Sequence, residues 1–237
     1  MRKSPSFSER ADFLRLVPIF SSLSLPDLQE LSLITDFCTY KKGCYIFTKD
    51  DVGASFFIIK NGSAKVVIDY EDGKEITLSL LHPKDIFGEL SILDGMPRSA
   101  TVIAMDDCEI LSIERTKFID FLKDHPDVCI KILEVLSKRV RKADAQIEAL
   151  VLLKAEEKVA YTLLGLAREY GKKKEGEVLI DIKINHYDIG NMCGIRRETS
   201  NRIISGFIKN GIIKREKKKI IILDEVALYR ILKKEVN

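Results

Sequence analysis

Residues 185–213, NHYDIGNMCGIRRETSNRIISGFIKNGII, decide the fold of the carboxy-terminal part of the chain. Asn185 can cap a helix together with Asp188 three residues later, in the manner of a capping box. Cys193–Gly194 provides a tight turn, after which apolar residues recur at helical spacing. The stretch therefore predicts a helix, a turn and a second helix.

The second helix is predicted to have an apolar face and a polar face. The apolar face carries Thr199, Ile203, Ile204, Phe207 and Ile208. The opposite face carries Arg197, Glu198, Asn201, Arg202 and Ser205. Arginine can bond guanine through two hydrogen bonds, glutamate can accept from cytosine, and asparagine can pair with adenine. The alternative is a solvated face with ion pairs, the usual explanation of a single charged helix.

A predicted hairpin, GIIKREKKKIIIL at residues 211–223, follows this helix directly. Its tip is basic and includes Lys217 and Lys218, as expected of a wing that contacts phosphates. Residues 151–237 carry a net charge of +7, whereas residues 1–150 carry −4. The two helices and the basic hairpin together favour double-stranded DNA as a partner.

Short runs rich in Val, Ile, Phe and Thr recur from Thr35 to Ile113 between glycine-bearing turns. One of these turns is the hairpin signal EDGKE at residues 71–75. Many short strands of this kind predict an antiparallel barrel or a double-sheet roll. Residues 8–34 predict two short helices before the strands, and FGELSILDG at residues 87–95 predicts one among them.

Apolar residues between positions 129 and 150 alternate at spacings of four and three. They are Cys129, Leu133, Leu136, Val140, Ala143, Ile147 and Leu150. A narrow stripe of this kind is typical of a two-helix seam and favours a parallel homodimer. The alternative is a helix packed on its own domain, although such packing usually shows a wider apolar stripe.

A further helix is predicted at residues 155–170, ending at Gly171. A lysine-rich loop, GKKKEGE at residues 171–177, is expected next, followed by a strand at residues 178–184. This strand leads into the predicted helix pair.

The composition of the 237 residues, 46% hydrophobic and 32% charged, predicts a folded chain. No apolar run approaches the roughly eighteen residues that a membrane span needs, and the start MRKSPSFSER lacks the apolar core of a signal peptide. We therefore expect a cytoplasmic protein with no membrane partner. The five cysteines are scattered without a CxxC pair, which argues against a disulfide framework, structural zinc or a cysteine-held cluster.

The order of these features resembles the bacterial CRP/FNR family of transcription regulators, from about Phe20 to Leu223. The resemblance is carried by the glycine-punctuated roll with FGEL and RSATV, by the seam helix, and by RRETSNRII at residues 196–204. It implies an α+β fold in three parts. These are a jelly-roll-like, double-stranded β-roll at residues 1–124, a long dimerisation helix at 125–153 and a winged helix-turn-helix at 154–237.

The resemblance implies DNA contacts as well. Arg197, Glu198 and Arg202 match base-reading positions, and Thr199 matches a phosphate contact. Relatives often have a helix-capping Ser at the position of Arg196, so the helix start is expected to be less well capped, or Arg196 to contact phosphate itself. The DNA-binding set is completed by Asn201, Lys217 and Lys218. The expected partners are a palindromic operator, bound by a homodimer, and RNA polymerase.

The stretch FGELSILDGMPRSATV at residues 87–102 matches the ligand cassette of cyclic-nucleotide-binding members. That cassette offers a helix N-terminus and an arginine to the cyclic phosphate, and a glutamate to the ribose hydroxyl. Backbone N–H groups from Gly88 to Leu90 and the forked side chain of Arg98 suit a phosphate. Ser99 can add a hydroxyl, and Glu89 can accept from a sugar.

The base contact is expected to depart from the family pattern. Members that recognise cyclic AMP use adjacent hydroxyl residues on the seam helix, and an ungapped extrapolation places Ala143 and Asp144 there. Neither residue offers a hydroxyl, although Asp144 can accept from an adenine amine. The resemblance implies a cyclic nucleotide, cAMP or cGMP, as the effector and no other cofactor, whereas this departure argues against cAMP in particular and favours a vacant pocket.

Three alternatives stay open. In one, Glu89 and Arg98 pair with each other in a vacant pocket, and the regulator is effector-independent or redox-responsive. In another, the chain is a cyclic-nucleotide-binding regulatory subunit without DNA function. The third, an enzyme that hydrolyses cyclic nucleotides, is disfavoured because three separated histidines supply neither clustered metal ligands nor a nucleophile with its base. No catalytic or metal-binding residue is predicted.

Overall fold

The computed structural model describes residues 4–69, 75–174 and 176–233. The chain divides into two compact units, Met1–Val140 and Arg141–Asn237, and the division lies within one long helix. Both units combine helices with antiparallel sheet, which confirms the predicted α+β class. Among the described residues, no helix has the length and apolar character needed to cross a membrane.

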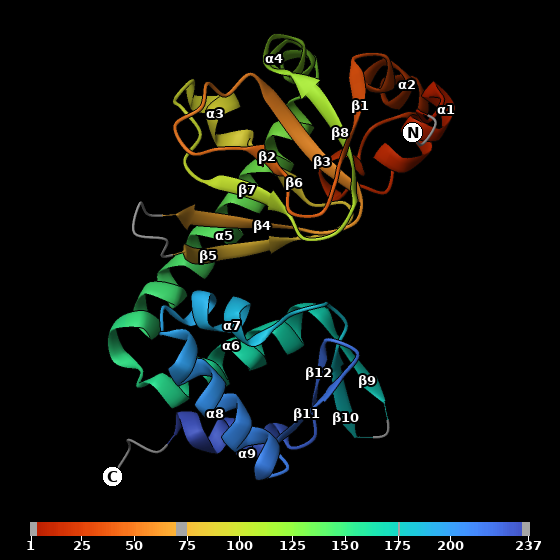
Figure 1. Ribbon diagram of the computed structural model, residues 1–237. Coiled ribbons are helices and arrows are strands. Elements are labelled where there is room, and N and C mark those ends of the chain that lie inside the picture. Colours follow the sequence, from red (N-terminus) through yellow and green to blue (C-terminus); the bar gives the residue numbers. More distant parts are fainter. Residues whose placement is uncertain (1–3, 70–74, 175, 234–237) are drawn as a thin grey trace. The chain divides into compact units, whose positions relative to one another are not determined.

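Two four-stranded antiparallel sheets form the β-roll of the first unit (Figure 1). Their orders are β1-β8-β3-β6 and β2-β7-β4-β5. The strands are β1 (Thr35–Tyr40), β2 (Tyr45–Phe47), β3 (Ser55–Asn61), β4 (Ala64–Asp69), β5 (Glu75–Leu81), β6 (Ile86–Phe87), β7 (Thr101–Ala104) and β8 (Cys108–Glu114). The predicted roll is confirmed. Residues 71–74 of the predicted EDGKE turn lie outside the described residues, and the strands that flank it pair from Asp69 to Glu75.

Helices cover one face of the first sheet. They are α1 (Phe7–Leu14), the 3-10 helix η1 (Pro18–Phe20), α2 (Leu25–Leu33) and α4 (Arg115–Asp124), and the short helix α3 (Glu89–Asp94) lies between β6 and β7. Successive residues of β3 enter different cores, because side chains alternate along a strand. Phe56 and Ile58 pack under the helices, with the Phe56 ring stacked on Phe118, whereas Phe57 and Ile59 lie in the core shared by the two sheets.

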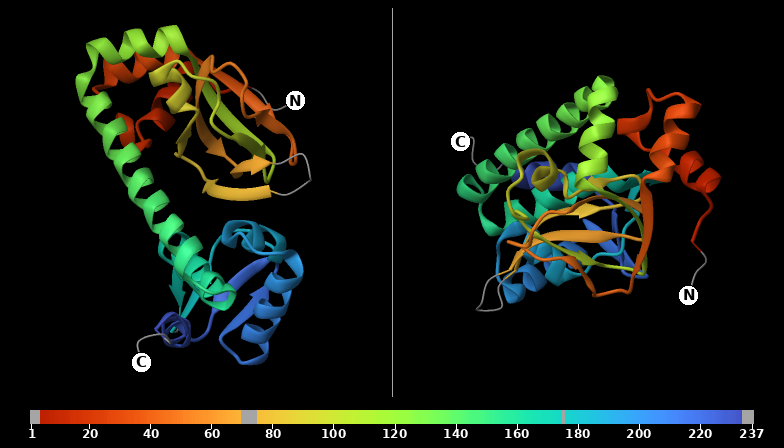
Figure 2. Two further views of the ribbon diagram at one scale, coloured as in Figure 1. Left: turned by 90° about the vertical axis from the view of Figure 1, so that its left-hand side faces the viewer. Right: turned by 90° about the horizontal axis from the view of Figure 1, so that it is seen from above.

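The predicted long helix is α5, Pro126–Leu152 (Figure 2). Its first turns bury Val128 and Ile132 in the core under the helices of the first unit. Leu136 packs partly against the same core, whereas Leu133 and Val140 are 62% and 61% exposed. One side of the helix thus packs on its own roll, as in the alternative interpretation of the sequence, and the other side leaves apolar residues exposed.

The second unit contains the helices α6 (Ala155–Tyr170), α7 (His186–Cys193), α8 (Arg197–Lys209) and α9 (Glu225–Leu232). They pack with a four-stranded sheet of order β11-β12-β10-β9. The strands are β9 (Gly171–Lys174), β10 (Glu177–Ile180), β11 (Ile213–Glu216) and β12 (Lys219–Ile222). The predicted pair of helices on either side of Cys193–Gly194 is confirmed as α7 and α8, and the predicted hairpin after it is confirmed as β11 and β12.

The lysine-rich segment after α6 corrects one prediction. A loop was expected at residues 171–177, but residues 171–174 form β9, an edge strand paired with β10. Exposed lysines suit a sheet edge because their charges discourage pairing with another chain. Gly171, at the helix end, has an extended φ of −76°, and a Cβ there would lie 2.1 Å from the Ala167 carbonyl oxygen. Close approach, not a left-handed backbone, therefore requires this glycine.

Candidate functional site

The first candidate site surrounds the turn between β6 and α3. Gly88 caps α3 with a φ of 75°, and a Cβ at this position would lie 2.6 Å from Arg98 Nη1. Arg98 is 4% exposed; its Nη1 donates to the Gly88 carbonyl at 2.8 Å and its Nη2 donates to the Ser55 carbonyl at 2.6 Å. The absence of a side chain at residue 88 is what lets the guanidinium approach the backbone.

Two aromatic rings complete the surroundings of Arg98. Its guanidinium carbon lies 4.3 Å from the centre of the Phe47 ring and 5.4 Å from that of Phe57, at distances suited to cation–π attraction. Burial lowers the pKa of Arg98, while the charges of Glu89 and Asp51 oppose that effect. The Nε atom is buried and has no hydrogen-bond partner among the described residues.

Glu89 pairs with an arginine that was not predicted from the sequence. Glu89 is 3% exposed, and its Oε1 accepts from Arg139 Nη1 at 2.5 Å. Arg139 Nη2 donates to the Ile86 carbonyl, also at 2.5 Å. The expected alternative of a Glu89–Arg98 pair is therefore wrong for this structure, since the terminal nitrogens of Arg98 donate to carbonyl groups. Glu89 Oε2 is buried without a hydrogen-bond partner among the described residues.

Gly88, Glu89, Arg98 and Arg139 together form a group that we name the cradle. The other predicted ligand-binding residues have exposed side chains. Leu90 is 43% exposed, and Ser99 and Asp144 are exposed as well. Asp144 belongs to the part of α5 in the second compact unit. Its contact with a base stays a prediction, as do the roles of Leu90 and Ser99.

The second candidate site is the helix pair α7 and α8. The predicted cap of α7 is confirmed, because Asn185 Oδ1 accepts from the Asp188 amide at 3.0 Å and the Asp188 carboxylate accepts from the Asn185 amide at 2.9 Å. Gly194 ends α7 with a φ of 61°. Ser200, fully buried on α8, donates from Oγ to the His186 carbonyl at 2.9 Å and fastens the two helices together.

The polar face of α8 is largely open. Arg197, Glu198 and Arg202 are exposed, whereas Asn201 and Thr199 are half-buried. Arg196, also exposed, is the N-cap residue and makes no side-chain capping bond, in keeping with the weak cap expected there. Ile208, predicted on the apolar face, is 39% exposed. Ser200, which the sequence pattern placed on neither face, is fully buried beside α7, where a Cβ at Gly190 would lie 3.2 Å from the Ser200 Cβ.

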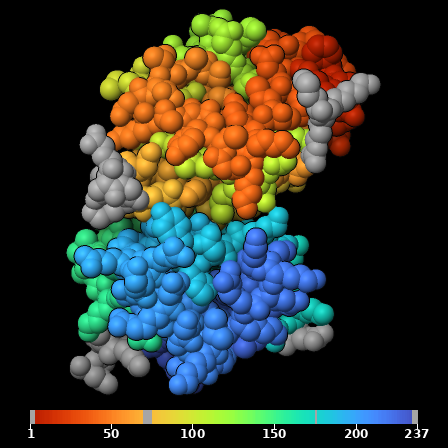
Figure 3. All heavy atoms as spheres, viewed as in Figure 1, coloured from red at the N-terminus to blue at the C-terminus, as the bar shows by residue number. Residues whose placement is uncertain are grey.

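The hairpin of β11 and β12 is named the wing. Lys217 and Lys218 form its tip, both exposed, with φ values of 46° and 69°. Two consecutive left-handed residues match the type of turn that suits a twisted hairpin, but this turn normally uses Asn and Gly. The wing and α8 both reach the surface on the face shown in Figure 3. Two strained lysines are thus held at the tip of the hairpin.

Ion pairs join the wing to the part of the sheet beside it. Lys214 Nζ lies 2.7 Å from Glu177 Oε2 on β10. Asp181 pairs with both Lys172 and Lys219, and these two bonds lower the pKa of Asp181 to about 2. The wing is therefore tied to the neighbouring hairpin by charge as well as by strand pairing.

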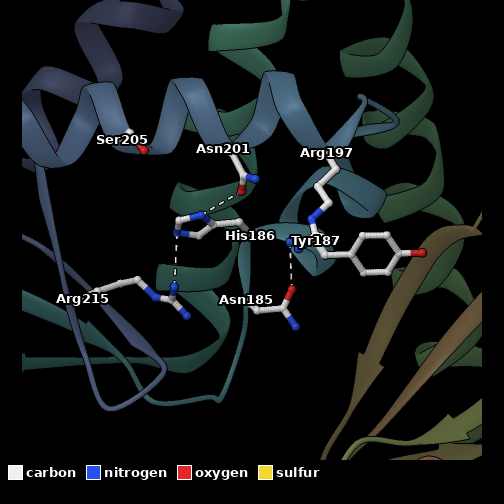
Figure 4. A pocket seen from close by; sticks show the side chains of 7 residues that line it. All are labelled: Asn185, His186, Tyr187, Arg197, Asn201, Ser205 and Arg215. Carbon is white, nitrogen blue, oxygen red and sulfur yellow. Dashed lines mark hydrogen bonds between the residues drawn. The ribbon is translucent and has the colours of Figure 1, made fainter.

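A groove opens between the start of α7, the middle of α8 and β11 (Figure 4). Its volume is about 710 Å³, and it is lined by Asn185, His186, Tyr187, Arg197, Asn201, Ser205 and Arg215. His186 stands at its centre, with one ring nitrogen directed at Asn201 and the other at Arg215.

Sequence reasoning missed Arg139, His186 and Arg215. For Arg139 a signal exists, because Val128, Ile132 and Leu136 follow one another at intervals of four and Arg139 continues that face after three more residues. The pairing partners of His186 and Arg215 come from three separate elements, so no local pattern identifies them.

The described residues contain no group of His, Cys, Asp or Glu that could hold a metal ion. Two buried thiols are poorly suited to redox sensing. Burial raises the pKa of Cys193 to about 11, and burial also raises the pKa of Cys108. Both thiols therefore stay protonated near neutral pH, and a thiolate is the reactive form.

Two family models match the chain. The model described as the cyclic nucleotide-binding domain matches residues 37–125, and the Crp-like helix-turn-helix domain matches residues 157–231. The first match contains three of the four cradle residues, all but Arg139, and the second contains α7, α8 and the wing.

Relatives and solved structures agree with these matches. The cyclic AMP receptor protein of Thermus thermophilus is 30% identical over 193 residues, which cover 79% of this chain and 86% of the relative. The global nitrogen regulator of Synechocystis is 30% identical over 192 residues, covering 80% and 85%. The structure of a CooA mutant from Carboxydothermus hydrogenoformans superposes with a TM-score of 0.75 at 24% identity, covering 92% and 95% of the two chains. This last likeness bears on the fold alone.

Proposed function

Because the chain belongs to the CRP/FNR family of transcription regulators, we propose that it acts as a homodimer on a palindromic operator and responds to a cyclic nucleotide. Membership of the family makes it a DNA-binding transcription regulator with a cyclic-nucleotide-binding domain. Its relatives are regulators, not enzymes, and we propose no catalytic activity. RNA polymerase is the further partner proposed for such a regulator.

The exposed apolar stripe of α5 is the observation that carries the homodimer. Leu133, Val140 and Ile147 are 62%, 61% and 60% exposed, and Leu150 is 41% exposed. Their spacing of seven, seven and three residues keeps them on one side of the helix. A row of large apolar side chains in water is unfavourable, and the same row on a second copy would cover it. The stripe is therefore proposed as the dimer contact.

A twofold dimer would present two copies of α8 to DNA. Half-sites must then lie about 34 Å apart, one helical turn, for both helices to enter successive major grooves. Arg197, Glu198 and Arg202 are proposed to read bases, with Asn201 beside them. The phosphate contacts are proposed for Arg196, Thr199, Lys217 and Lys218.

Two buried polar atoms support a nucleotide in the cradle. Glu89 Oε2 can accept a hydrogen bond, Arg98 Nε can donate one, and neither has a hydrogen-bond partner among the described residues. Buried polar groups normally find partners, so these two atoms fit a polar ligand. A cyclic nucleotide brings a ribose hydroxyl for Glu89 and a phosphate for Arg98. Gly88, Leu90 and Ser99 are proposed beside the phosphate, and Asp144 beside the base.

A second candidate is a regulator without a nucleotide effector. It is favoured by the internal bonds of the cradle, since Arg139 already neutralises Glu89 and both terminal nitrogens of Arg98 are engaged. In a redox-controlled version the sensing thiol would be Cys38, Cys44 or Cys129, because the pKa values of the other two thiols are raised. Calorimetry with cyclic nucleotides, described below, distinguishes the two candidates.

Light scattering of the parent and of Val140→Glu tests the homodimer. The parent is expected at twice the chain mass of 26.9 kDa, and the variant at the chain mass, because the new carboxylate would be buried in the contact. Lys138→Glu, which places the same carboxylate at an exposed position on the opposite side of α5, is the control and is expected to stay dimeric. A parent that is monomeric at micromolar concentration would contradict the proposal.

Selection of duplexes from a randomised pool, followed by calorimetry with cAMP and cGMP, tests the operator and the effector. The parent is expected to select a palindrome and to release heat with one of the nucleotides, whereas folded Arg98→Ala releases none. An absence of heat with both nucleotides, together with a selected palindrome, would favour the effector-independent candidate.

A further inference from the structure

Both ring nitrogens of His186 are engaged in the groove of the second unit. Nδ1 lies 3.0 Å from Asn201 Oδ1 on α8, and Nε2 lies 3.4 Å from Arg215 Nη1 on β11 (Figure 4). Burial lowers the pKa of His186; the bond to Asn201 opposes this, and the charge of Arg215 adds to it. The imidazole thus links α8 to the wing within this groove.

The chemistry of Arg215 determines where the proton of His186 resides. A guanidinium only donates hydrogen bonds, so Nε2 must accept from it. An imidazole with a free lone pair on Nε2 is neutral and carries its proton on Nδ1. Nδ1–H therefore donates to Asn201, and the acceptor on that side must be the amide oxygen. The three residues form one directed chain, from Arg215 through His186 to Asn201.

This chain fixes the orientation of the Asn201 amide. Its oxygen is turned towards His186, and its NH2 group points away from the imidazole (Figure 4). The sequence pattern predicts that Asn201 uses its oxygen and its nitrogen together on adenine. With the oxygen turned to His186, the group left for DNA is a hydrogen-bond donor.

We propose that His186 is a positioning residue for base discrimination, which holds Asn201 so that it offers a donor to the major groove. This inference rests on the proposed DNA-binding function. Purine N7, guanine O6 and thymine O4 are acceptors in that groove, whereas cytosine presents an amino donor. Asn201 therefore disfavours cytosine on the strand that it faces.

The placement of His186 is fixed by its backbone as well. Its carbonyl accepts from Ser200 Oγ at 2.9 Å, and the preceding residue, Asn185, caps α7. His186 is therefore attached to α8 at two points, its backbone carbonyl through Ser200 and its ring through Asn201. A side chain held in this way can transmit the position of the wing to the amide.

The charges around His186 make the arrangement sensitive to acid. Arg197 from α8 and Arg215 from β11 line the groove, together with Tyr187 from α7 itself, and no carboxylate lines it among the described residues. Asp188 on α7 bonds the Asn185 amide instead. A proton on Nε2 would face the guanidinium of Arg215, so protonation removes that contact. The positive charge of a protonated His186 is attracted to DNA phosphates and therefore raises affinity for every sequence alike. The effect of pH on Asn201 is therefore measured as discrimination between sequences, not as affinity.

A double-mutant cycle on the full chain tests the inference. Parent, His186→Ala, Asn201→Ala and the double variant are profiled on randomised duplexes at about pH 7.5, roughly a unit above the ordinary histidine pKa. Each single variant is expected to lose about fivefold to tenfold discrimination at the same base pair, and the double variant no more than either single one, because His186 acts through Asn201. Tyr187→Phe is the matched control, because Tyr187 lines the same groove but has no part in the hydrogen bonds that join Arg215, His186 and Asn201. This variant is expected to change discrimination less than about twofold.

Conservative replacement and pH separate positioning from a merely structural role. His186→Gln keeps an amide donor for Asn201 and is expected to retain the base preference. The pKa of His186 is lowered from the ordinary value of 6.5, so discrimination by the parent is expected to hold near neutral pH and to fall only as the pH drops below 6.5, whereas that of His186→Gln stays constant. Thermal melting of every variant checks that the second unit is folded.

Three results would overturn the inference. They are a preserved preference in folded His186→Ala, a preference unaffected by Asn201→Ala, and independent losses that add in the double variant. A parent that selects no duplex at all would contradict the proposed function instead, so the two failures are distinguishable.

Discussion

The cradle and the face of α8 use arginine in opposite ways. In the cradle Arg98 is 4% exposed, its terminal nitrogens are bonded to two carbonyl groups, and Arg139 is paired with Glu89. On α8, Arg197 and Arg202 are exposed to solvent. Arginine is thus buried and hydrogen-bonded within the protein in one unit, and exposed to solvent in the other.

This difference in burial and bonding determines how much it costs each site to bind an anion. A buried charge is tolerated only with partners, so a ligand of the cradle has to exchange some existing bonds for new ones, at a cost to its affinity. The exposed arginines of α8 have few bonds to give up, and their removal costs the fold little. Variants in the two sites should therefore separate stability from recognition.

The largest effect on stability is expected from Arg98→Ala. The change leaves the Gly88 and Ser55 carbonyls without their donors and the Glu89 charge less compensated, which should reduce the free energy of unfolding by about 3 kcal/mol. Urea unfolding followed by circular dichroism measures this loss. Arg197→Ala is the matched control and should stay within about 0.5 kcal/mol of the parent. Equal losses in the two variants would remove the contrast between the sites.

Arg197→Ala should instead change recognition. Loss of one bidentate base contact is expected to cost about 2 kcal/mol of discrimination, or roughly thirtyfold, between the selected operator and its scrambled form. Competitive gel shifts with the two duplexes give this ratio. If affinity for both duplexes fell by the same factor, Arg197 would contact only phosphate.

A smaller pair of opposing effects is expected at the tip of the wing. Lys218→Gly relieves a left-handed residue with φ of 69° and should stabilise the chain by about 0.5 kcal/mol. The lost charge should weaken binding to all duplexes and reduce the slope of log affinity against log salt by about 1. Lys218→Arg keeps both the charge and the strain and should leave that slope unchanged. A sequence-dependent loss in Lys218→Gly would assign Lys218 to base reading.

The smallest effect concerns acid. The pKa of Asp181 is about 2, below its usual value of 3.8, because Lys172 and Lys219 favour the charged form. Its contribution to stability is therefore present above about pH 4 and is lost as the pH falls through about 2. The difference in thermal midpoint between the parent and Asp181→Asn should narrow over this range. A difference that does not change with pH would show that the charge of Asp181 is not what stabilises the wing.

Local patterns in the sequence predicted much of the fold. Short runs rich in Val, Ile, Phe and Thr between glycine-bearing turns predicted the roll, and the Asn185–Asp188 capping box and Gly194 predicted the helix pair, because each signal lies within a few residues of the structure it forms. The lysine-rich segment at residues 171–174 was missed as a strand, since pairing with β10 and not its own side chains makes it one.

Contacts within the candidate sites were harder to predict. Gly88, Glu89 and Arg98 are close in sequence and were selected together, but the partner of Glu89 lies fifty residues away on α5. The orientation of Asn201 likewise depends on His186, fifteen residues earlier, and Arg215, fourteen residues later. Residue types and spacing indicate which side chains can bind a ligand. Tertiary packing determines which other residues these side chains already contact, and local sequence does not show it.

The position of Arg139 on α5 has a mechanical consequence. Arg139 is directed at Glu89, and the next residue, Val140, lies on the exposed stripe. A ligand that took Glu89 away from Arg139 would release one side of α5, a continuous helix whose exposed stripe is proposed to contact a second subunit. In such a dimer, rotation or sliding of α5 by a fraction of a turn would displace the contact helix of both subunits together, without any hinge or loop in between.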